Sequence, residues 1–342
     1  MTRLTPNDET PRVLLAHGGG GTLTHDLIAE RILPRLANPA LSALGDSAVL
    51  ANPGRPLCLT TDSFVVRPLQ FPGGDIGRLA VCGTVNDLAV AAAEPLALTL
   101  SLVIEEGLPL ATLDAVLDSL AAAAGEAGVS VVTGDTKVIE YTRGDGLIIN
   151  TAGLGAARPG AKLSLDRAEP GDVLVVTGLL AEHGLAVMSA REGLGLSTDI
   201  RSDAAPLNGL VAAMLDSGAD MKFLRDPTRG GLAGVLADLV DAGWGAEVRE
   251  ADLPVSPPCR HAAELLGLDP LTVANEGKVL AVVAKRDAER LLSACEAHPL
   301  GRQAVAIGHL TDAAPPLAEL VTPFGGRRIV QRTYGEELPR IC

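Results

Sequence analysis

Short apolar runs alternate with longer runs of helical period along this chain, and this alternation is the strongest constraint on its fold. Apolar runs of strand length include 96–104, 147–154 and 173–177, whereas 75–93 and 110–124 carry apolar residues at helical spacing. Such alternation is typical of α/β or α+β domains, in which helices cover a sheet. Hydrophobic residues form 47% of the chain and aromatic residues only 2%, so Ala, Leu and Val must build the core.

The length and one shift in composition predict two domains. A chain of 342 residues is long enough for two cores. Prolines, glycines and charged residues gather at 157–171, where we place the boundary. The sequence thus predicts an N-terminal domain over 1–157, a C-terminal α/β domain over 168–315 and a flexible tail over 324–342. The tail is rich in glycine and charge, and it shows no apolar period.

The last residue of the chain is a cysteine, Cys342. A thiol at the end of a thin tail can enter an active site and carry a group there as a thioester-like adduct. The alternative is a frayed terminus that ends in cysteine by chance. Only five of the 342 residues are cysteines, so a functional thiol is the favoured interpretation. The cysteines form no CxxC pair and no zinc pattern, which predicts free thiols in a reducing cytoplasm.

Charge and hydropathy argue against two classes of partner. The formal net charge is −14 and no stripe of Lys and Arg is present, which argues against a nucleic-acid partner. No uncharged apolar run reaches the length of a membrane span. Residues 1–12 are polar and lack the apolar core of a signal peptide.

Five aspartates have small or polar neighbours at expected strand or loop ends, and this set predicts a metal–nucleotide site. They are Asp46, Asp62, Asp87, Asp135 and Asp226. Each one alone is better explained as a helix cap or turn residue. Carboxylates that converge from several strands, however, suit a hard cation such as Mg²⁺ together with phosphate oxygens.

Two glycine-containing stretches are candidates for phosphate binding. Gly18, Gly19, Gly20 and Gly21 follow a strand-like run, but they match neither a P-loop nor a dinucleotide fingerprint, and a flexible lid is an equal interpretation. The stretch 226–232 is more specific. Arg229 can pair with phosphate, and the two glycines after it can open a helix whose N-terminus favours anions.

Two further residues are candidates for proton transfer. Glu276 stands just before a buried strand, where it can act as a base or merely cap a turn. Lys137 follows a Gly-Asp-Thr turn and can hold a phosphate or act as an acid or base, unless it is a plain surface lysine.

Taken together, these stretches resemble the HypE family of hydrogenase maturation proteins, which are carbamoyl dehydratases in the AIR synthetase-like (PurM-like) superfamily. The resemblance covers essentially the whole chain and is carried by 61–66, 71–77, 83–89, 134–137, 226–233 and 275–277. The C-terminal Pro-Arg-Ile-Cys at 339–342 separates this family from its relatives. Three alanines stand at 91–93 where a glycine is expected, which should alter packing at most.

The resemblance implies a two-domain PurM-like fold and a homodimer with ATP bound at an associated cleft. It also implies a reaction. The carbamoyltransferase HypF would place a carbamoyl group on Cys342, ATP would phosphorylate the carbamoyl oxygen, and a base would remove an amide proton. Loss of phosphate would leave a thiocyanate, and the cyano group would pass to iron on a HypC–HypD scaffold.

On this basis each candidate residue has an expected role. Mg²⁺ would be held by Asp46, Asp62, Asp87, Asp135 and Asp226. ATP would contact Gly18, Gly19, Gly20, Gly21, Asn86, Thr136, Lys137 and Arg229 as well as the aspartates. The base would be Glu276, with Lys137 as second choice, and Cys342 would carry the substrate.

Two alternatives remain at this stage. One is a small-molecule kinase or ligase of the same superfamily, which the terminal cysteine argues against. The other is a carrier or docking protein without catalysis, whose tail is an interaction peptide. The set of aspartates argues against that class.

Overall fold

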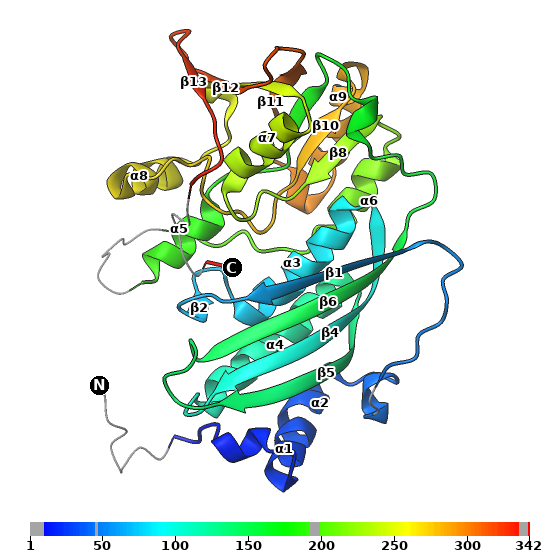
Figure 1. Ribbon diagram of the computed structural model, residues 1–342, viewed down its shortest axis with the longest axis vertical. Coiled ribbons are helices and arrows are strands. Elements are labelled where there is room, and N and C mark those ends of the chain that lie inside the picture. The colour runs from blue at the N-terminus through cyan, green and yellow to red at the C-terminus, as the bar shows by residue number, and fades with distance from the viewer. Residues whose placement is uncertain (1–9, 45–46, 192–198, 335–340) are drawn as a thin grey trace.

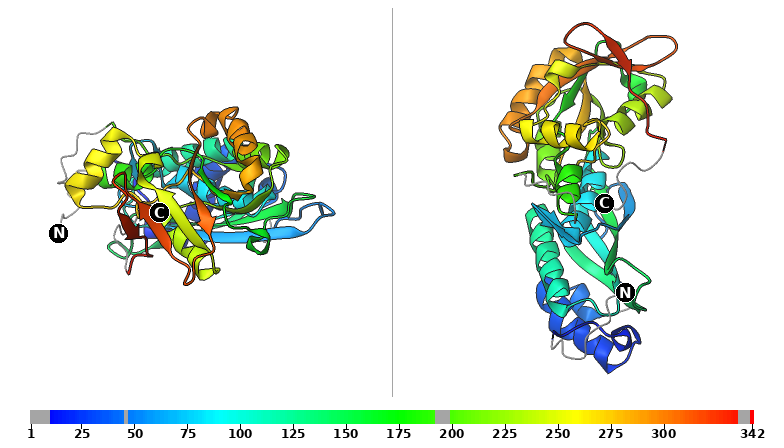
Figure 2. Two further views of the ribbon diagram at one scale, coloured as in Figure 1. Left: turned by 90° about the horizontal axis from the view of Figure 1, so that it is seen from above. Right: turned by 90° about the vertical axis from the view of Figure 1, so that its left-hand side faces the viewer.

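The computed structural model describes residues 10–44, 47–191, 199–334 and 341–342. The described chain contains two sheets with helices, one built from each half of the sequence, and these halves stack along the long axis of the molecule (Figures 1 and 2). The predicted mixture of helices and sheets is therefore correct. The C-terminus lies at the junction between the halves, far from the C-terminal sheet that precedes it (Figure 2).

The N-terminal half forms a four-stranded sheet in the order β1-β6-β4-β5. Its strands are β1 (Leu57–Phe64), β4 (Ala93–Glu105), β5 (Ser130–Ile139) and β6 (Leu147–Ala157). The pair β4 and β5 is parallel, and the other neighbours are antiparallel. Strands β1 and β5 are the edges of this sheet. A two-stranded ribbon, β2 (Gln70–Phe71) with β3 (Gly74–Asp75), leads from β1 into the first long helix.

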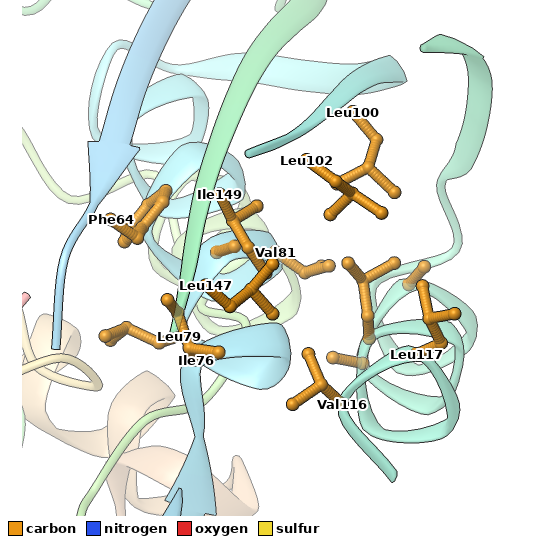
Figure 3. Packing of buried hydrophobic residues seen from close by; sticks show 14 of the residues in the cluster. Phe64, Ile76, Leu79, Val81, Leu100, Leu102, Val116, Leu117, Leu147 and Ile149 are labelled. Atoms are coloured by element: carbon orange, nitrogen blue, oxygen red, sulfur yellow. The ribbon is translucent and has the colours of Figure 1, made fainter. Parts of the chain in front are cut away.

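Two long helices, α3 (Ile76–Val90) and α4 (Leu110–Ala127), pack together against one face of this sheet. The carboxylate of Asp75 caps α3 by accepting a hydrogen bond from the backbone of Arg78. Close approach of the helices requires Gly77, since a Cβ there would lie 2.3 Å from the carbonyl oxygen of Val116. Figure 3 shows the apolar layer between helices and sheet, which includes Leu79 and Val81 of α3 and Leu147 and Ile149 of β6.

The strand expected at residues 13–15 does not form. Val13 is buried, but Leu14 and Leu15 are 51% and 43% exposed, and an isolated bridge between Arg12 and Pro109 replaces a strand pair. The segment instead begins a series of short helical elements beside β5. They are η1 (Leu15–Gly18), α1 (Thr22–Leu27), the π-helix η2 (Ile28–Ile32), α2 (Leu33–Leu36) and η3 (Leu41–Ala43).

The C-terminal half forms a seven-stranded sheet in the order β13-β12-β9-β11-β7-β10-β8. Its strands are β7 (Val173–Val176), β8 (Met221–Arg225), β9 (Gly245–Arg249), β10 (Leu280–Val283), β11 (Val305–Thr311), β12 (Ala318–Val321) and β13 (Arg327–Ile329). Only β9 and β12 pair in parallel. The helices of this half are α5 (Glu182–Ser189), α6 (Asn208–Asp216), α7 (Gly231–Asp241), α8 (Pro257–Leu266) and α9 (Ala288–Glu296). The short helices are η4 (Leu165–Arg167), η5 (Glu250–Asp252), η6 (Lys285–Asp287) and η7 (Pro299–Gly301).

The segment expected as a flexible tail from residue 324 differs from that expectation at its start. Strand β13 pairs antiparallel with β12, and Val330 beyond it is buried. An ordered edge strand therefore extends into this segment, and residues 335–340 lie outside the described part. None of the helices in the described part of the chain combines the length and apolar content of a membrane-crossing helix.

Candidate active site at the junction of the two halves

A cavity of about 480 Å³ lies where the two halves of the molecule meet. Strand β1 and helix α3 supply one wall, and the loop after β8 supplies another. The polar and reactive side chains that line it are Cys58, Thr60, Asp62, Ser63, Asp87, Arg225, Asp226, Thr228, Arg229, Glu276 and Cys342. Residues more than 280 positions apart in the sequence are thus brought into one cavity.

Three of the five predicted aspartates line this cavity, although not at the ends of strands as expected. Asp62 lies within β1 and Asp87 within α3, while only Asp226 follows a strand. Thr84 donates its hydroxyl to Asp62 at 3.3 Å, and Thr60 donates to Asp87 at 2.7 Å. These two contacts run between β1 and α3 and orient both carboxylates.

The three carboxylates repel one another. Burial, followed by the charges of Asp87 and Asp62, raises the pKa of Asp226 to about 7. Burial and the charge of Asp87 also raise the pKa of Asp62. A bound cation would relieve this repulsion, so the electrostatics of the cavity favour a cationic ligand.

The donor set fits Mg²⁺ that is bound together with a polyphosphate. Among the described residues, no three carboxylate, thiol or imidazole groups gather closely enough to hold a metal ion by themselves. Mg²⁺ commonly takes only one or two carboxylates and completes its shell with phosphate oxygens and water. Asp62, Asp87 and Asp226 are the residues that would hold it, and Asp46 lies outside the described residues.

A site for anions lies next to the carboxylates. Thr228 and Arg229 line the cavity directly before α7, whose N-terminal amides favour negative charge. Gly230 and Gly231 have φ values of 76° and 59°, in the left-handed region. A Cβ at Gly231 would also lie 2.4 Å from the carbonyl oxygen of Leu271, so only glycine allows this approach to the helix.

Glu276 is a buried acid with an unused oxygen. The residue is 2% exposed, and its Oε1 has no hydrogen-bond partner within the described part of the chain. Burial raises the pKa of Glu276 well above its ordinary value, and the charges of Asp226 and Asp203 raise it further. A carboxylate in such surroundings accepts a proton readily, as a general base must.

The chain end lies inside the cavity with this acid. Cys342 is half-buried, lines the cavity and packs against the apolar cluster of the N-terminal half. Ile341, the residue before it, is 3% exposed. The structure therefore places the terminal thiol in the same cavity as Glu276 and the three aspartates.

Asn86, an expected nucleotide contact, lies behind the cavity instead of in its lining. Its amide nitrogen donates to the carbonyl oxygens of Ala205 and Glu276, both at 3.1 Å. Its amide oxygen accepts from the backbone of Leu207 at 2.7 Å. In this structure Asn86 fastens the loop that carries Glu276, and a nucleotide contact for it stays a prediction.

The remaining predicted residues gather at a second cavity of about 330 Å³ beside β5. Its polar lining comprises Gly18, Gly19, Gly20, Asp135, Thr136 and Lys137, and its apolar wall comes from 28–44 and from β4. Gly21 adjoins this cavity as the N-cap of α1. Lys137 is exposed and lies 3.4 Å from a carboxylate oxygen of Asp135.

The two cavities are separated by the width of the sheet. Asp62 pairs with Thr151, Thr151 with Leu100, and Leu100 with Gly134, so three strand spacings of roughly 5 Å each lie between the edges. Paired residues share a face, and Asp135 follows Gly134, so Asp135 faces the side opposite Asp62. Within one chain, Asp135 is therefore not brought together with the other three aspartates.

Sequence reasoning missed two residues that support the site. Asp203 accepts hydrogen bonds from the backbone amides of Glu276 and Gly277, both at 3.1 Å. His183 is completely buried and hydrogen-bonded to the chain end. Asp203 lies in an irregular segment and His183 in a short helix, so neither had a periodic or motif signal.

Comparison with known proteins agrees with this architecture. Residues 44–157 match the AIR synthase related protein N-terminal domain, and residues 169–315 match the corresponding C-terminal domain. Carbamoyl dehydratase HypE of Azotobacter vinelandii is 49% identical over 331 residues, which is 96% of this chain and 97% of that protein.

Solved structures give the same relationship. The structure of hydrogenase maturation protein HypE in complex with ATP superposes with a TM-score of 0.92 at 40% identity, covering 96% of this chain and 99% of that one. HypE in a HypE–HypF complex superposes with a TM-score of 0.78 at 45% identity, covering 92% and 100%. The predicted two-domain PurM-like fold is confirmed, and the chain belongs to the HypE family of carbamoyl dehydratases.

Proposed function

We propose that this protein dehydrates a carbamoyl group carried on its own Cys342, using ATP, to give the thiocyanate from which a cyanide ligand of nickel–iron hydrogenase is made. The observation that carries the proposal is the presence of Cys342, Glu276 and the three aspartates in one cavity. The relative from Azotobacter vinelandii reported above is named a carbamoyl dehydratase, which supports the same reaction.

The chemistry requires activation of a poor leaving group. The amide oxygen of the S-carbamoyl group takes the γ-phosphoryl group of ATP, and ADP leaves. The nitrogen loses one proton as the C=N bond forms. It loses the second as the C–O bond breaks and phosphate departs, which leaves S–C≡N. The amide oxygen ends in phosphate, so the sum is loss of one water coupled to hydrolysis of one ATP.

Glu276 is the group we assign to removal of an amide proton. Its free oxygen Oε1 and its raised pKa suit a base that shares a cavity with the thiol carrying the amide. Lys137, the second choice from the sequence, is 63% exposed and lines the other cavity. The geometry within one chain thus favours Glu276.

The phosphoryl group is held by the anion site and the aspartates. Arg229 and the N-terminus of α7 would bind phosphate oxygens, while Asp62, Asp87 and Asp226 would hold Mg²⁺. The metal would supply neutralisation of the charge on the transferring phosphoryl group. The ATP complex of a similar protein, reported above, supports ATP as the substrate.

A homodimer would give the second cavity a role. Among the described residues strand β1 has a partner strand on one side only, and Leu57 and Leu59 on it are 56% and 77% exposed. An unpaired edge with exposed apolar side chains favours pairing with a second copy. We propose this dimer, with Gly18, Gly19, Gly20, Gly21, Asp135, Thr136 and Lys137 serving nucleotide binding at the assembled cleft.

Two partners follow from the proposed reaction, which we place in the cytoplasm. A carbamoyltransferase must load Cys342, and the solved HypE–HypF complex reported above supports HypF in that role. A HypC–HypD scaffold would receive the cyano group on iron. Loading requires the chain end to leave the cavity, because Ile341 is buried in the described state.

Intact-mass spectrometry tests the proposal. The chain is incubated with the carbamoyltransferase, carbamoyl phosphate and ATP, then isolated and given fresh Mg–ATP. We expect a gain of about 43 Da at Cys342 that falls by about 18 Da, the mass of one water. Cys58→Ser is the matched control, because Cys58 lines the same cavity. It should keep both mass changes, and Cys342→Ser should lose them.

One result would favour the superfamily kinase instead. That result is the absence of any adduct at Cys342 while the protein consumes ATP on a small molecule. Formation of the adduct without the later loss of water would also contradict the proposed dehydration.

A further inference from the structure

The end of the chain is held by specific contacts as well as by its tether. The described chain resumes at Ile341, whose side chain is 3% exposed and belongs to the apolar cluster that includes Val187 and Ala274. Both of those residues come from the C-terminal half, whereas most of the cluster comes from the N-terminal half. The docked end therefore lies across the junction of the two halves, as its position in Figure 2 shows.

One side chain binds the backbone of this end. His183 of α5 is completely buried, and its Nε2 lies 2.9 Å from the carbonyl oxygen of Ile341. Its Nδ1 lies 2.8 Å from the hydroxyl oxygen of Ser202. The ring of Phe71 meets the imidazole edge-on, with centroids 5.4 Å apart. Both ring nitrogens of His183 therefore have hydrogen-bond partners, and the partner of Nε2 is the chain end.

The tautomer of His183 follows from its partners. A carbonyl oxygen only accepts hydrogen bonds, so Nε2 must carry the proton. The Ser202 oxygen already accepts from the backbone of Ala204 at 3.2 Å, which leaves its own hydroxyl proton for Nδ1. Burial lowers the pKa of His183, which keeps the ring neutral and preserves this arrangement.

Asp203 connects the contact between His183 and Ser202 to the proposed base, Glu276. Asp203 follows Ser202 and binds the backbone amides of Glu276 and Gly277 through its two carboxylate oxygens. A Cβ at Gly277 would lie 1.9 Å from the carbonyl oxygen of Asp203, so the two segments are in close contact. Ser202 and Asp203 therefore fix the chain end and the base relative to each other.

We propose that His183 is a positioning residue for the dehydration: by holding the carbonyl of Ile341, it places the Cys342 thiol beside Glu276. His183 is not among the described residues that line the cavity, so it acts through the chain end and not on the reacting atoms. This inference rests on the proposed function for its catalytic consequence, but the docking contact itself does not.

The test compares His183→Leu with His183→Gln in the full-length protein. Leucine removes the donor and leaves the Ile341 carbonyl without its partner. Glutamine can place an amide N–H near the position of Nε2 and should restore the contact in part. His261→Gln is the matched control, since His261 is exposed on α8.

Two readouts are needed. The first is the rate at which iodoacetamide alkylates Cys342 in the uncarbamoylated protein, measured on the C-terminal peptide. The second is the single-turnover rate of dehydration of the pre-carbamoylated protein at saturating Mg–ATP, with the Kd of ATP measured separately. The first readout does not depend on dehydration, so it decides the docking contact even if the proposed function fails.

For His183→Leu we expect alkylation about tenfold faster and dehydration about tenfold slower, with the Kd of ATP unchanged. His183→Gln should reverse part of both changes, and His261→Gln should match the wild type. Equal alkylation and equal turnover in His183→Leu would overturn the proposal. If His183→Leu does not fold, Ser202→Ala carries the test, because losing the hydroxyl that fixes the tautomer should shift both rates in the same directions. Unchanged rates there would likewise overturn the proposal.

Discussion

The crowding of acids in the cavity should make the stability of the empty protein fall as pH rises, and Asp226→Asn should remove much of this effect. The pKa of Asp226 is raised from 3.8 to about 7, first by burial and then by Asp87 and Asp62. Because the folded protein holds this proton more tightly than the unfolded chain, the contribution of Asp226 to stability is fully present below pH 3.8. It is lost as pH rises through about 7.

The size of this effect follows from the pKa. One pKa unit corresponds to about 1.4 kcal/mol, so the full loss across this window is about 4 kcal/mol. Between pH 5 and pH 8 the loss is about 3 kcal/mol, since part of it has already occurred below pH 5. Asparagine keeps the shape of the side chain without the charge. The variant should therefore gain about 3 kcal/mol relative to the wild type when pH is raised from 5 to 8.

Urea unfolding at the two pH values measures this difference, without Mg²⁺ or nucleotide. Trp244 is the only tryptophan, and it packs against the apolar cluster of the C-terminal half. Asp226 lies in the same half, so the fluorescence of Trp244 reports unfolding of the domain that contains Asp226. Asp312→Asn is the control, because Asp312 is exposed in the same half. A difference between Asp226→Asn and the wild type that is the same at pH 5 and pH 8 would refute the reasoning.

Three further variants test separate parts of the structure. Glu276→Gln should bind ATP normally and lower the single-turnover rate of dehydration by about 10²- to 10⁴-fold, as measured by loss of 18 Da from the carbamoylated chain; thiocyanate formation at the normal rate would remove Glu276 from the role of base. Cys342→Ala should leave the thermal midpoint unchanged, because Cys342 is only half-buried and alanine keeps its Cβ; a drop of several degrees would contradict this. Ala92→Gly should raise the free energy of unfolding by about 0.5–1 kcal/mol, because Ala92 has a φ of 54° in the left-handed region, and a lower midpoint in calorimetry would show that no strain is relieved.

The elements predicted best from the sequence are those with the longest apolar patterns. Helices α3 and α4 and strand β4 are each at least 13 residues long, so their patterns stand out clearly. Strands β8, β9 and β12 have five residues or fewer and carry charged residues among their apolar ones, so no pattern stands out, whereas β7 is as short but continuously apolar and could be recognised. The same limit explains why the segment after residue 324 was expected to lack a strand.

The composition of the site was easier to predict than its assembly. Asp62, Asp87, Asp226 and Glu276 were identified by residue type and neighbours, and the cavity contains all four. The sequence could not show that Asp135 faces the other side of the sheet, because the face of a strand residue depends on register with three other strands. A buried histidine such as His183 acts through one hydrogen bond to a residue 158 positions away, which leaves no local pattern.

On the proposed function, attachment of the carbamoyl group to Cys342 makes the enzyme and its substrate one covalent molecule, and the burial of Ile341 gives its end two competing tasks. A tethered group meets its catalytic residues at an effective concentration set by the chain, so dehydration should show no saturation in free carbamoyl donor. Burying an isoleucine side chain is worth about 1.5–3 kcal/mol, which corresponds to roughly 10- to 150-fold preference for the docked end. The same preference for the docked state makes the Cys342 thiol less accessible to the carbamoyltransferase that must load it. On this proposal the apolar contact at residue 341 sets the balance between loading and dehydration, and a smaller side chain there should speed loading and slow dehydration.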